Sequence, residues 1–250
     1  MIIRWVIRLL LYGQFFVEKM FRTGPHKRQA PGSVQSPHAP LQNRLKYLLF
    51  KHHVKQYHES SCSVASVACI VNALQENAGM IVQSAVSQQD LLNRVRTAHW
   101  KERMSEHGYK GRRGLPLAVL ETVVIHALDV YKIQYGAIEK VQASRDVNLS
   151  GKIKNQLKNR LFQFEKYGDC LILSHFDQGS FIPGLHIPHI SPVGGYDPDT
   201  GQVTILDVDP SQTHPYKVSF DTYYKGISNH YFHMFKLFGY GEGGYIFIQL

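Results

Sequence analysis

The chain has 250 residues, 44% hydrophobic and 19% charged, which suffices for one folded domain and excludes collagen-like, low-complexity and wholly disordered chains. Its three cysteines exclude a framework of fully paired disulfides and a zinc site built from four thiolates. Residues 1–60 carry +8 of the net charge of +9, so the rest of the chain lacks the basic face that a nucleic-acid partner would require.

Residues 1–22 form a basic, apolar arm that allows three interpretations. The segment 2–17 is mostly apolar, but Arg4 and Arg8 interrupt it, so it is too short and too charged for a clear transmembrane helix. A basic helix face opposite Trp5 and aliphatic side chains favours a helix that lies on a membrane surface. A signal peptide or anchor, and a helix packed on the folded domain, are the alternatives. We therefore expect a cytoplasmic or membrane-associated protein, with export as the alternative.

Residues 23–40 are expected to form a linker. Four prolines lie there among Gly, Ser, Gln and His, and the segment has no apolar period. The folded domain is therefore expected to span residues 41–250.

The first half of this domain has the pattern of helices. Small and apolar residues at helical spacing predict a buried helix over 62–74, and Ser87 and Asp90 are typical of a helix start. The polar, glycine-containing segment 99–114 is predicted to be a loop. Further helices are predicted over 115–128, with Pro116 in the first turn, and over 149–166, and a strand is predicted over 130–135.

The second half has the pattern of strands separated by turns. Strands are predicted over 170–175, 187–196, 202–208 and 245–249, and the sequence Asp197-Pro-Asp-Thr-Gly201 predicts a hairpin turn. Helices followed by an antiparallel sheet indicate an α+β fold.

Cys62 is the candidate nucleophile. It stands at the predicted start of a helix, where the helix dipole and the free N–H groups favour a thiolate. Gln56, six residues earlier, could donate its side-chain amide to an oxyanion, together with the backbone N–H of Cys62. Taken alone, this pattern is more often that of a cysteine buried in a core.

Two further residues strengthen the catalytic interpretation. His189 and Asp207 lie on consecutive predicted strands, so a hairpin can bring them together. Asp207 could then orient the imidazole while His189 takes the proton of the thiol. The order Cys, His, Asp, with Gln six residues before the Cys, matches the papain-type arrangement.

The chain resembles the phytochelatin synthases, a family of papain-like cysteine transpeptidases, over about residues 50–230. The motifs of the histidine and the aspartate are the most specific parts of this resemblance. The similar segments are Gln56…Cys62-Ser-Val-Ala-Ser, Gly114-Leu-Pro-Leu, Gly168-Asp-Cys-Leu-Ile-Leu-Ser174, His189-Ile-Ser-Pro-Val-Gly-Gly-Tyr196 and Ile205-Leu-Asp-Val208.

The resemblance implies the roles of the site residues. Cys62 would be the nucleophile, His189 the general base and acid, Asp207 the orienting carboxylate and Gln56 the oxyanion donor. The implied substrate is glutathione or a related thiol peptide, whose γ-Glu-Cys unit is held as a thioester and passed to water or to a second glutathione. No tightly bound cofactor is implied. A heavy metal such as Cd²⁺ or Zn²⁺ would enter as the thiolate of the substrate.

The chain departs from the family pattern at two places near these residues. Ser63 follows the nucleophile where the family usually has Gly. Pro210 stands where the family has a basic residue that helps to hold the carboxylate of the substrate, and Asp209 adds a negative charge beside it. The Cys-rich region that follows the domain in plant members is absent from this sequence.

Two other functions are kept as alternatives. The first is a cysteine protease or deconjugating enzyme that acts on another peptide or protein. The second is an inactive papain-like module that binds at a membrane.

Other histidines, cysteines and basic residues have simpler interpretations. The pairs His186/His189 and His230/His233 have the spacing of metal ligands, but no acidic third ligand is spaced nearby, so we expect no metal site. Cys69 and Cys170 are expected in the core. The basic residues of the segment 108–114 are expected to form a solvated loop, with contact to an anionic substrate as the alternative.

Overall fold

The computed structural model describes residues 43–80, 84–182, 187–228 and 243–250, together with residues 30, 32–34 and five isolated positions between residues 6 and 17. The predicted arm, 1–22, and most of the predicted linker, 23–40, therefore lie outside the described residues. Within the described part of the chain, no helix combines the length and the apolar character needed to span a bilayer.

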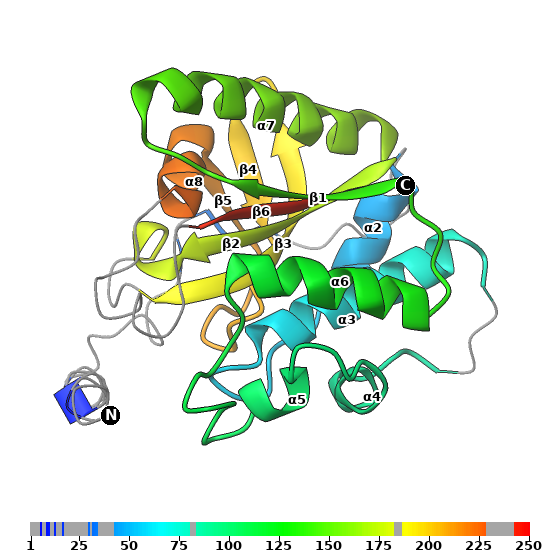
Figure 1. Ribbon diagram of the computed structural model, residues 1–250. Helices are drawn as coiled ribbons and strands as arrows, with labels where there is room; N and C mark the ends of the chain where they lie inside the picture. Colours follow the sequence, from blue (N-terminus) through cyan, green and yellow to red (C-terminus); the bar gives the residue numbers. More distant parts are fainter. Residues whose placement is uncertain are drawn as a thin grey trace.

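The centre of the fold is a sheet in which every pair of neighbouring strands is antiparallel. The strand order in the described chain is β1-β6-β2-β3-β4-β5 (Figure 1). The mixed α+β class with an antiparallel sheet is thus confirmed. The strands are β1 (Ala137–Gln142), β2 (Cys170–Asp177), β3 (Pro188–Asp197), β4 (Gln202–Ile205), β5 (Tyr216–Ser219) and β6 (Gly244–Gln249).

Helices cover both faces of this sheet (Figure 1). On one face α2 and α3 pack against β3, while α6 packs against β1 and β6. On the other face α7 packs against β2 and β3, and α8 packs against β2. The short helices α4 and α5 lie outside α3. The helices are α2 (Arg44–Lys51), α3 (Cys62–Asn77), α4 (Gln88–Arg94), α5 (Trp100–Arg103), α6 (Leu117–Val130), α7 (Val147–Tyr167) and α8 (Phe220–Ile227).

Helix α3 is the central helix of the domain. Every residue from Cys62 to Gln75 is buried. Small side chains on all sides of the helix let α2, α4, α6 and β3 approach it closely. The helix predicted over 62–74 is therefore confirmed, and Cys62 is its first residue.

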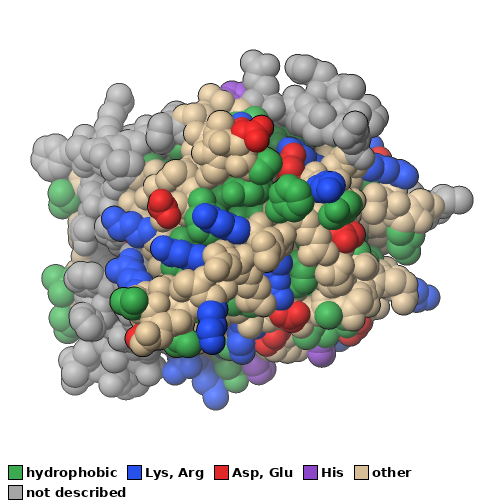
Figure 2. Space-filling model, turned by 90° about the horizontal axis from the view of Figure 1, so that it is seen from above, with side chains coloured by type: hydrophobic (Ala, Val, Ile, Leu, Met, Phe, Trp, Pro, Cys, Tyr) green, Lys and Arg blue, Asp and Glu red, His purple; other side chains and the backbone are tan. Residues whose placement is uncertain are grey.

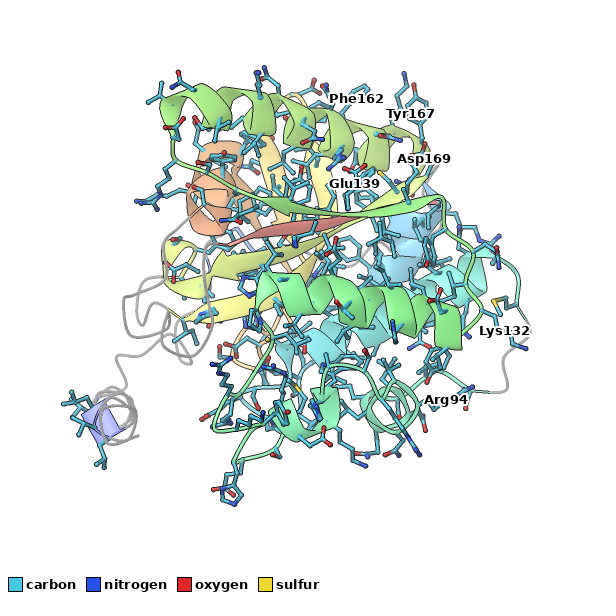
Figure 3. The ribbon with its side chains drawn as sticks, viewed as in Figure 1. Arg94, Lys132, Glu139, Phe162, Tyr167 and Asp169 are labelled. Atoms are coloured by element: carbon cyan, nitrogen blue, oxygen red, sulfur yellow. The ribbon has the colours of Figure 1, made fainter. Side chains whose placement is uncertain are left out.

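Helix α7 is amphipathic, as its sequence predicts. Its N-cap is Asp146, and it ends at Gly168, whose φ of 64° is easily adopted by glycine. Arg160 points inward and forms an ion pair with Glu139. Phe162 and Tyr167 lie at the outer surface (Figure 3). Seen from above, this side of the molecule carries basic, acidic and hydrophobic side chains intermixed (Figure 2).

The prediction of a strand over 130–135 is wrong. Val130 is the last residue of α6, and the following strand, β1, begins only at Ala137. Lys132 has a left-handed φ of 55°, and the N–H of Ile133 donates to the carbonyl of Leu128. These features belong to a helix C-terminus in which a hydrophobic residue folds back onto the last turn. The apolar alternation therefore reflects this helix end and not a pleated strand.

Two other expectations need correction. The segment 99–114, predicted to be a loop, contains α5 and a tight hairpin in which Tyr109 and Arg112 pair. The strand predicted over 202–208 ends at Ile205. The predicted hairpin turn after β3 is confirmed, because Asp197 Oδ1 accepts hydrogen bonds from the N–H groups of Asp199 and Thr200.

A short part of the segment 23–40 pairs with the sheet. Ser33 forms an antiparallel bridge with Tyr216 of β5. The N–H of Val34 donates to the carbonyl of Pro215 at 2.7 Å, and the N–H of Lys217 donates to the carbonyl of Gly32 at 3.1 Å. Residues 32–34 therefore extend the sheet beyond β5.

Candidate active site

A tight turn presents Cys62. Ser61 Oγ accepts the N–H of His58 and donates to the carbonyl of the same residue, which closes the turn just before α3. The side chain of Cys62 stands at the start of the helix, where the first-turn N–H groups of the backbone have no partner within the helix. Cys62 is 7% exposed, so its thiol is largely shielded from solvent.

His189, on β3, contacts both of the other predicted catalytic residues. Its Nε2 lies 2.8 Å from Asp207 Oδ1. Cys62 also acts on the imidazole from close by and raises the pKa of His189. Since Nε2 faces Asp207, Nδ1 is the ring nitrogen left for Cys62. The ring of Phe176 meets the imidazole edge-on, with centroids 5.4 Å apart, and helps to fix its orientation.

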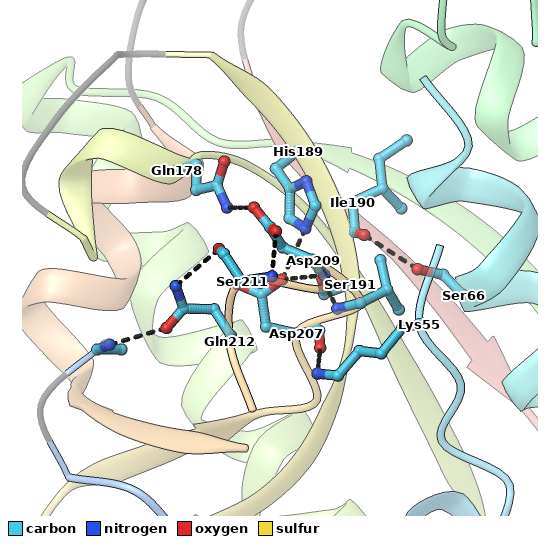
Figure 4. A network of polar contacts seen from close by, with 12 residues as sticks. Lys55, Ser66, Gln178, His189, Ile190, Ser191, Asp207, Asp209, Ser211 and Gln212 are labelled. Atoms are coloured by element: carbon cyan, nitrogen blue, oxygen red, sulfur yellow. Dashed lines mark hydrogen bonds and ion pairs between the residues drawn. The ribbon is translucent and has the colours of Figure 1, made fainter. Parts of the chain in front are cut away.

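Asp207, two residues after β4, is held at both its carboxylate and its backbone (Figure 4). Besides His189, the carboxylate accepts hydrogen bonds from Tyr216 Oη at 2.6 Å and from the N–H of Asp209 at 2.9 Å. The backbone carbonyl of Asp207 accepts from His53 Nε2 at 2.9 Å and from Lys55 Nζ at 2.5 Å. The carboxylate is therefore fixed before any substrate binds.

These contacts separate the proton affinities of Asp207 and His189. Burial acts to raise the pKa of Asp207, but the charge of His189 and the surrounding hydrogen bonds outweigh it and lower the pKa to about 2. Burial acts to lower the pKa of His189, but the charge of Asp207 and the contact with Cys62 outweigh it and hold the pKa well above 6.5. The arrangement therefore favours an imidazolium between a carboxylate and a sulfur atom.

Gln56 lies beside the Asp207 loop. Its backbone N–H donates to the carbonyl of Val208 at 2.8 Å, and its side chain is 8% exposed. Among the described residues, nothing forms a hydrogen bond with the buried Gln56 Oε1. The unpaired atom is an acceptor, whereas an oxyanion needs the Nε2 donor, so the oxyanion role of Gln56 stays a prediction.

The structure thus brings Cys62, His189 and Asp207 into one connected array, with Gln56 on the segment that precedes Cys62. The match with known proteins points in the same direction. A family model described as phytochelatin synthase matches residues 41–231. The chain belongs to the phytochelatin synthase family. A search of curated proteins found no match.

Membership of the phytochelatin synthase family gives the site its chemical context. The family consists of enzymes that transfer γ-glutamylcysteine, and it implies glutathione as the substrate. The matched residues include Cys62, His189 and Asp207.

Ser63, where the phytochelatin synthase family usually has Gly, faces away from this array. It is fully buried, and its Oγ accepts a hydrogen bond from Trp100 Nε1 at 3.0 Å. The same hydroxyl contacts Met104 Sδ at 3.7 Å. The added side chain thus packs against α5 and the residue that follows it.

Asp209, which precedes the second departure at Pro210, is 3% exposed and belongs to the hydrogen-bond network (Figure 4). Its carboxylate accepts from Gln178 Nε2 at 2.7 Å and from the N–H of Ser211 at 2.8 Å. Pro210 is exposed beside it. The negative charge of Asp209 is therefore directed into the protein.

The other predicted features fall outside this array. Cys69 and Cys170 are free thiols in the core, and burial raises the pKa of each to about 12. The described residues contain no group of three or more side chains that could hold a metal ion. His186, His230 and His233 lie outside the described residues.

The basic segment 108–114 is ordered around Tyr109. The ring of Tyr109 stacks on His99, with centroids 3.8 Å apart, and Lys110 lies over the same ring. Arg113 Nη2 lies 3.4 Å from Ser60 Oγ, close to the turn that presents Cys62. The segment is a structured neighbour of the site, and its contact with substrate stays a prediction.

Tyr216, Lys55 and His53 are the contacts of Asp207 that the sequence did not predict. Tyr216 lies on a strand of only four residues, and no motif marks it. Lys55 directly precedes Gln56 in the sequence. This position of a cation next to a predicted site residue was the one feature that could have pointed to Lys55.

Proposed function

We propose that the protein is a papain-like cysteine enzyme that attacks the Cys–Gly peptide bond of glutathione or a related thiol peptide. The observation that carries the proposal is the position of His189, whose Nε2 lies 2.8 Å from Asp207 Oδ1 and whose pKa is raised by both Asp207 and Cys62. Membership of the phytochelatin synthase family supports the choice of glutathione.

In the first step, His189 holds the proton of Cys62, and the thiolate attacks the carbonyl carbon of the Cys–Gly bond. The negative charge that develops on the carbonyl oxygen is stabilised by the backbone N–H of Cys62 and by the side-chain amide of Gln56. His189 then gives its proton to the amine of glycine as the C–N bond breaks. Glycine leaves, and γ-Glu-Cys remains as a thioester on Cys62.

In the second step, His189 takes a proton from the acceptor, which attacks the thioester carbonyl and regenerates the thiol. Water gives free γ-Glu-Cys, and the amine of a second glutathione gives (γ-Glu-Cys)₂-Gly. The tight hold on Asp207 keeps the imidazole in the same orientation through both steps. Cd²⁺ or Zn²⁺ takes part as a thiolate complex of the substrate.

The second departure from the family pattern, at Pro210, bears on the acceptor. A proline at position 210 offers no positive charge to the carboxylate of a second peptide, and Asp209 points inward to Gln178. The missing positive charge at position 210 favours water as the acceptor. We therefore propose that hydrolysis to γ-Glu-Cys predominates over peptide extension.

The test is incubation of the full-length protein with glutathione, with and without Cd²⁺ or Zn²⁺, followed by mass spectrometry. Free glycine with γ-Glu-Cys is the expected result, and (γ-Glu-Cys)₂-Gly would reveal transfer. Cys62→Ala should abolish both products, His189→Ala should be nearly as damaging, and Asp207→Asn should retain more activity. Full turnover by Cys62→Ala would overturn the proposal.

A negative result with glutathione would still be informative. If no product forms but iodoacetamide alkylates Cys62 rapidly near neutral pH, the nucleophile is active and its substrate is another peptide or a protein. If Cys62 is also unreactive, the protein is an inactive binding module, and the enzymatic proposal fails.

A further inference from the structure

Lys55 lies in the hydrogen-bond network of the site but outside the array of Cys62, His189 and Asp207 (Figure 4). Its Nζ donates to the backbone carbonyl of Asp207 at 2.5 Å. Its backbone carbonyl accepts a hydrogen bond from Gln88 Nε2 at 2.8 Å, which fixes the segment on which it lies. A half-buried ammonium group therefore lies against the residue that orients His189.

This position places a positive charge beside two buried carboxylates. Asp207 is 0% exposed and Asp209 is 3% exposed, and the N–H of Asp209 donates to Asp207 Oδ1. Two buried negative charges this close together would repel each other strongly without compensation. Both carboxylates attract the ammonium group of Lys55 and oppose the fall in its pKa that burial causes.

The second donor to the same carbonyl carries no charge near neutral pH. His53 Nε2 lies 2.9 Å from the carbonyl oxygen of Asp207. Burial, and then the charge of Lys55, lower the pKa of His53 to about 4, so its imidazole is neutral at pH 7. Of the two donors, Lys55 is therefore the charged one.

We propose that Lys55 is a positioning residue of the active site, whose positive charge balances Asp207 and Asp209 and thereby sets the pH range in which Cys62 and His189 exist as thiolate and imidazolium. This inference rests on the proposed function of that pair. Lys55 Nζ bonds to the backbone of Asp207, so Lys55 acts on the pair through Asp207.

The other titratable groups around His189 come from several elements. His175 on β2 has its pKa lowered to about 4 by burial, so it is neutral at pH 7. Tyr216 on β5 has its pKa raised by burial and by Asp207, so it is neutral as well. Among the described residues, the charged groups near the pair are then Asp207, Asp209 and Lys55 on the side of His189. Arg113 and Glu59 lie beside the turn before Cys62, and the variants tested below leave both unchanged.

The direction of the effect follows from the sign of the charge. Loss of the positive charge makes the surroundings of the pair more negative, so the thiol ionises at higher pH and the imidazolium also loses its proton at higher pH. The bonds from Lys55 Nζ to Asp207 and from Asp207 to His189 limit the distance between the two charges to about 10 Å. At that distance, with an effective dielectric constant of about 20, one charge shifts such steps by up to about one pH unit.

The experiment is the pH dependence of Cys62 alkylation by iodoacetamide in the full-length protein, followed at the Cys62 peptide by mass spectrometry. Cys69 and Cys170 are fully buried and should not react while the protein is folded. The profile has two midpoints, one for ionisation of the thiol and one for loss of the imidazolium proton. Lys55→Met should move both midpoints upward by about half to one pH unit. Lys55→Arg should restore the wild-type midpoints.

His53→Leu is the matched control, because it removes the other donor to the Asp207 carbonyl without removing a charge. His53→Leu should change the rate of Cys62 alkylation but leave both midpoints in place. Equal shifts in Lys55→Met and His53→Leu, or no shift in either, would assign Lys55 a merely structural role and overturn the inference.

Asp209→Asn tests the same balance from the opposite side. It removes a negative charge and should move both midpoints downward, and in the double variant with Lys55→Met the midpoints should return toward those of the wild type. If Lys55→Met does not fold, an Asp209→Asn profile without a downward shift overturns the inference. A wild-type profile with one ordinary thiol step would instead overturn the proposed function itself.

Discussion

The indole Nε1 of Trp100 donates a hydrogen bond to Ser63 Oγ at 3.0 Å, and neither residue has any exposed surface. The bond joins α5 to the first turn of α3, one residue after Cys62. The backbone just before Trp100 is unusual, because Ala98 and His99 both have left-handed φ angles near 54°. The indole is thus held in place by a constrained segment.

Removal of either partner of this bond should destabilise the fold. We expect Trp100→Phe and Ser63→Ala each to lower the free energy of unfolding by about 1–3 kcal/mol, because each leaves a buried polar group without its partner. The double variant should lose less than the sum of the two. Chemical denaturation of the four proteins measures the coupling, and strictly additive losses would show that the bond contributes nothing.

Tyr216→Phe should destabilise the protein in a pH-dependent way. The pKa of Asp207 falls from 3.8 in the unfolded chain to about 2 in the folded protein, so its carboxylate stabilises the fold above about pH 4. That contribution is lost as the pH falls through about 2. Loss of the Tyr216 hydroxyl should therefore cost about 1.5–3 kcal/mol at pH 7 and progressively less below pH 4.

Tyr223→Phe is the control for this prediction. Tyr223 is also fully buried, but its hydroxyl bonds to the neutral Ser174 at 2.6 Å. Its cost, measured by urea denaturation at pH 7 and pH 3, should be nearly the same at both values. A cost for Tyr216→Phe that is equally independent of pH would contradict the assigned role of Asp207.

Gly194→Ala should strain the β3–β4 hairpin close to Asp207. The register of the two strands shifts between Val193 and Gly195, which marks a bulge, and a Cβ at Gly194 would lie 2.7 Å from the side chain of Leu206. Since Leu206 is buried and precedes Asp207, it has little room to move. We expect a loss of about 1–3 kcal/mol in the free energy of unfolding, measured by chemical denaturation, with reduced turnover.

The opposite result is expected for the same substitution in α7. A Cβ at Gly151 meets nothing within 4 Å, and the position is helical and exposed. Gly151→Ala should therefore stabilise the protein by about 0.5–1 kcal/mol. If both alanines had the same effect, the close approach at Gly194 would not be the cause.

Val34→Pro should loosen the pairing between residues 32–34 and β5. The substitution removes the N–H that donates to the carbonyl of Pro215, at a cost of about 1–2 kcal/mol. The amide of Lys217, which bonds to Gly32, should then exchange faster with deuterium in mass spectrometry. Val34→Ala keeps the N–H, so unchanged exchange in that variant would separate the hydrogen bond from the side chain.

Much of the site could be predicted because its signals are local. The small residues of α3 indicate a buried helix, and Cys62 at its start has the position of a nucleophile. His189 and Asp207 flank a hairpin turn whose residues, from Asp197 to Gly201, have unambiguous turn chemistry. Antiparallel pairing across such a turn brings the two side chains together without knowledge of the remaining fold.

The rest depends on contacts between distant parts of the chain. Tyr216 lies on a four-residue strand with little pattern of its own, and only the packing of β5 beside β4 brings its hydroxyl to Asp207. Lys55 approaches Asp207 because residue 56 bonds to Val208 across more than 150 residues of sequence. The wrong prediction of a strand over 130–135 has a local cause. A helix end that folds back onto its last turn has the same apolar alternation as a strand.

The pairing of residues 32–34 with β5 also bears on solubility. These residues precede the segment 41–231 that matches the family, so a protein that starts at residue 41 and keeps the rest of the chain, β6 included, would present the backbone of β5 to solvent. An uncovered edge strand is a template on which a second copy can pair. We therefore expect the shortened protein to self-associate increasingly as its concentration rises. In the longer chain, residues 32–34 cover the edge of β5 and should prevent this.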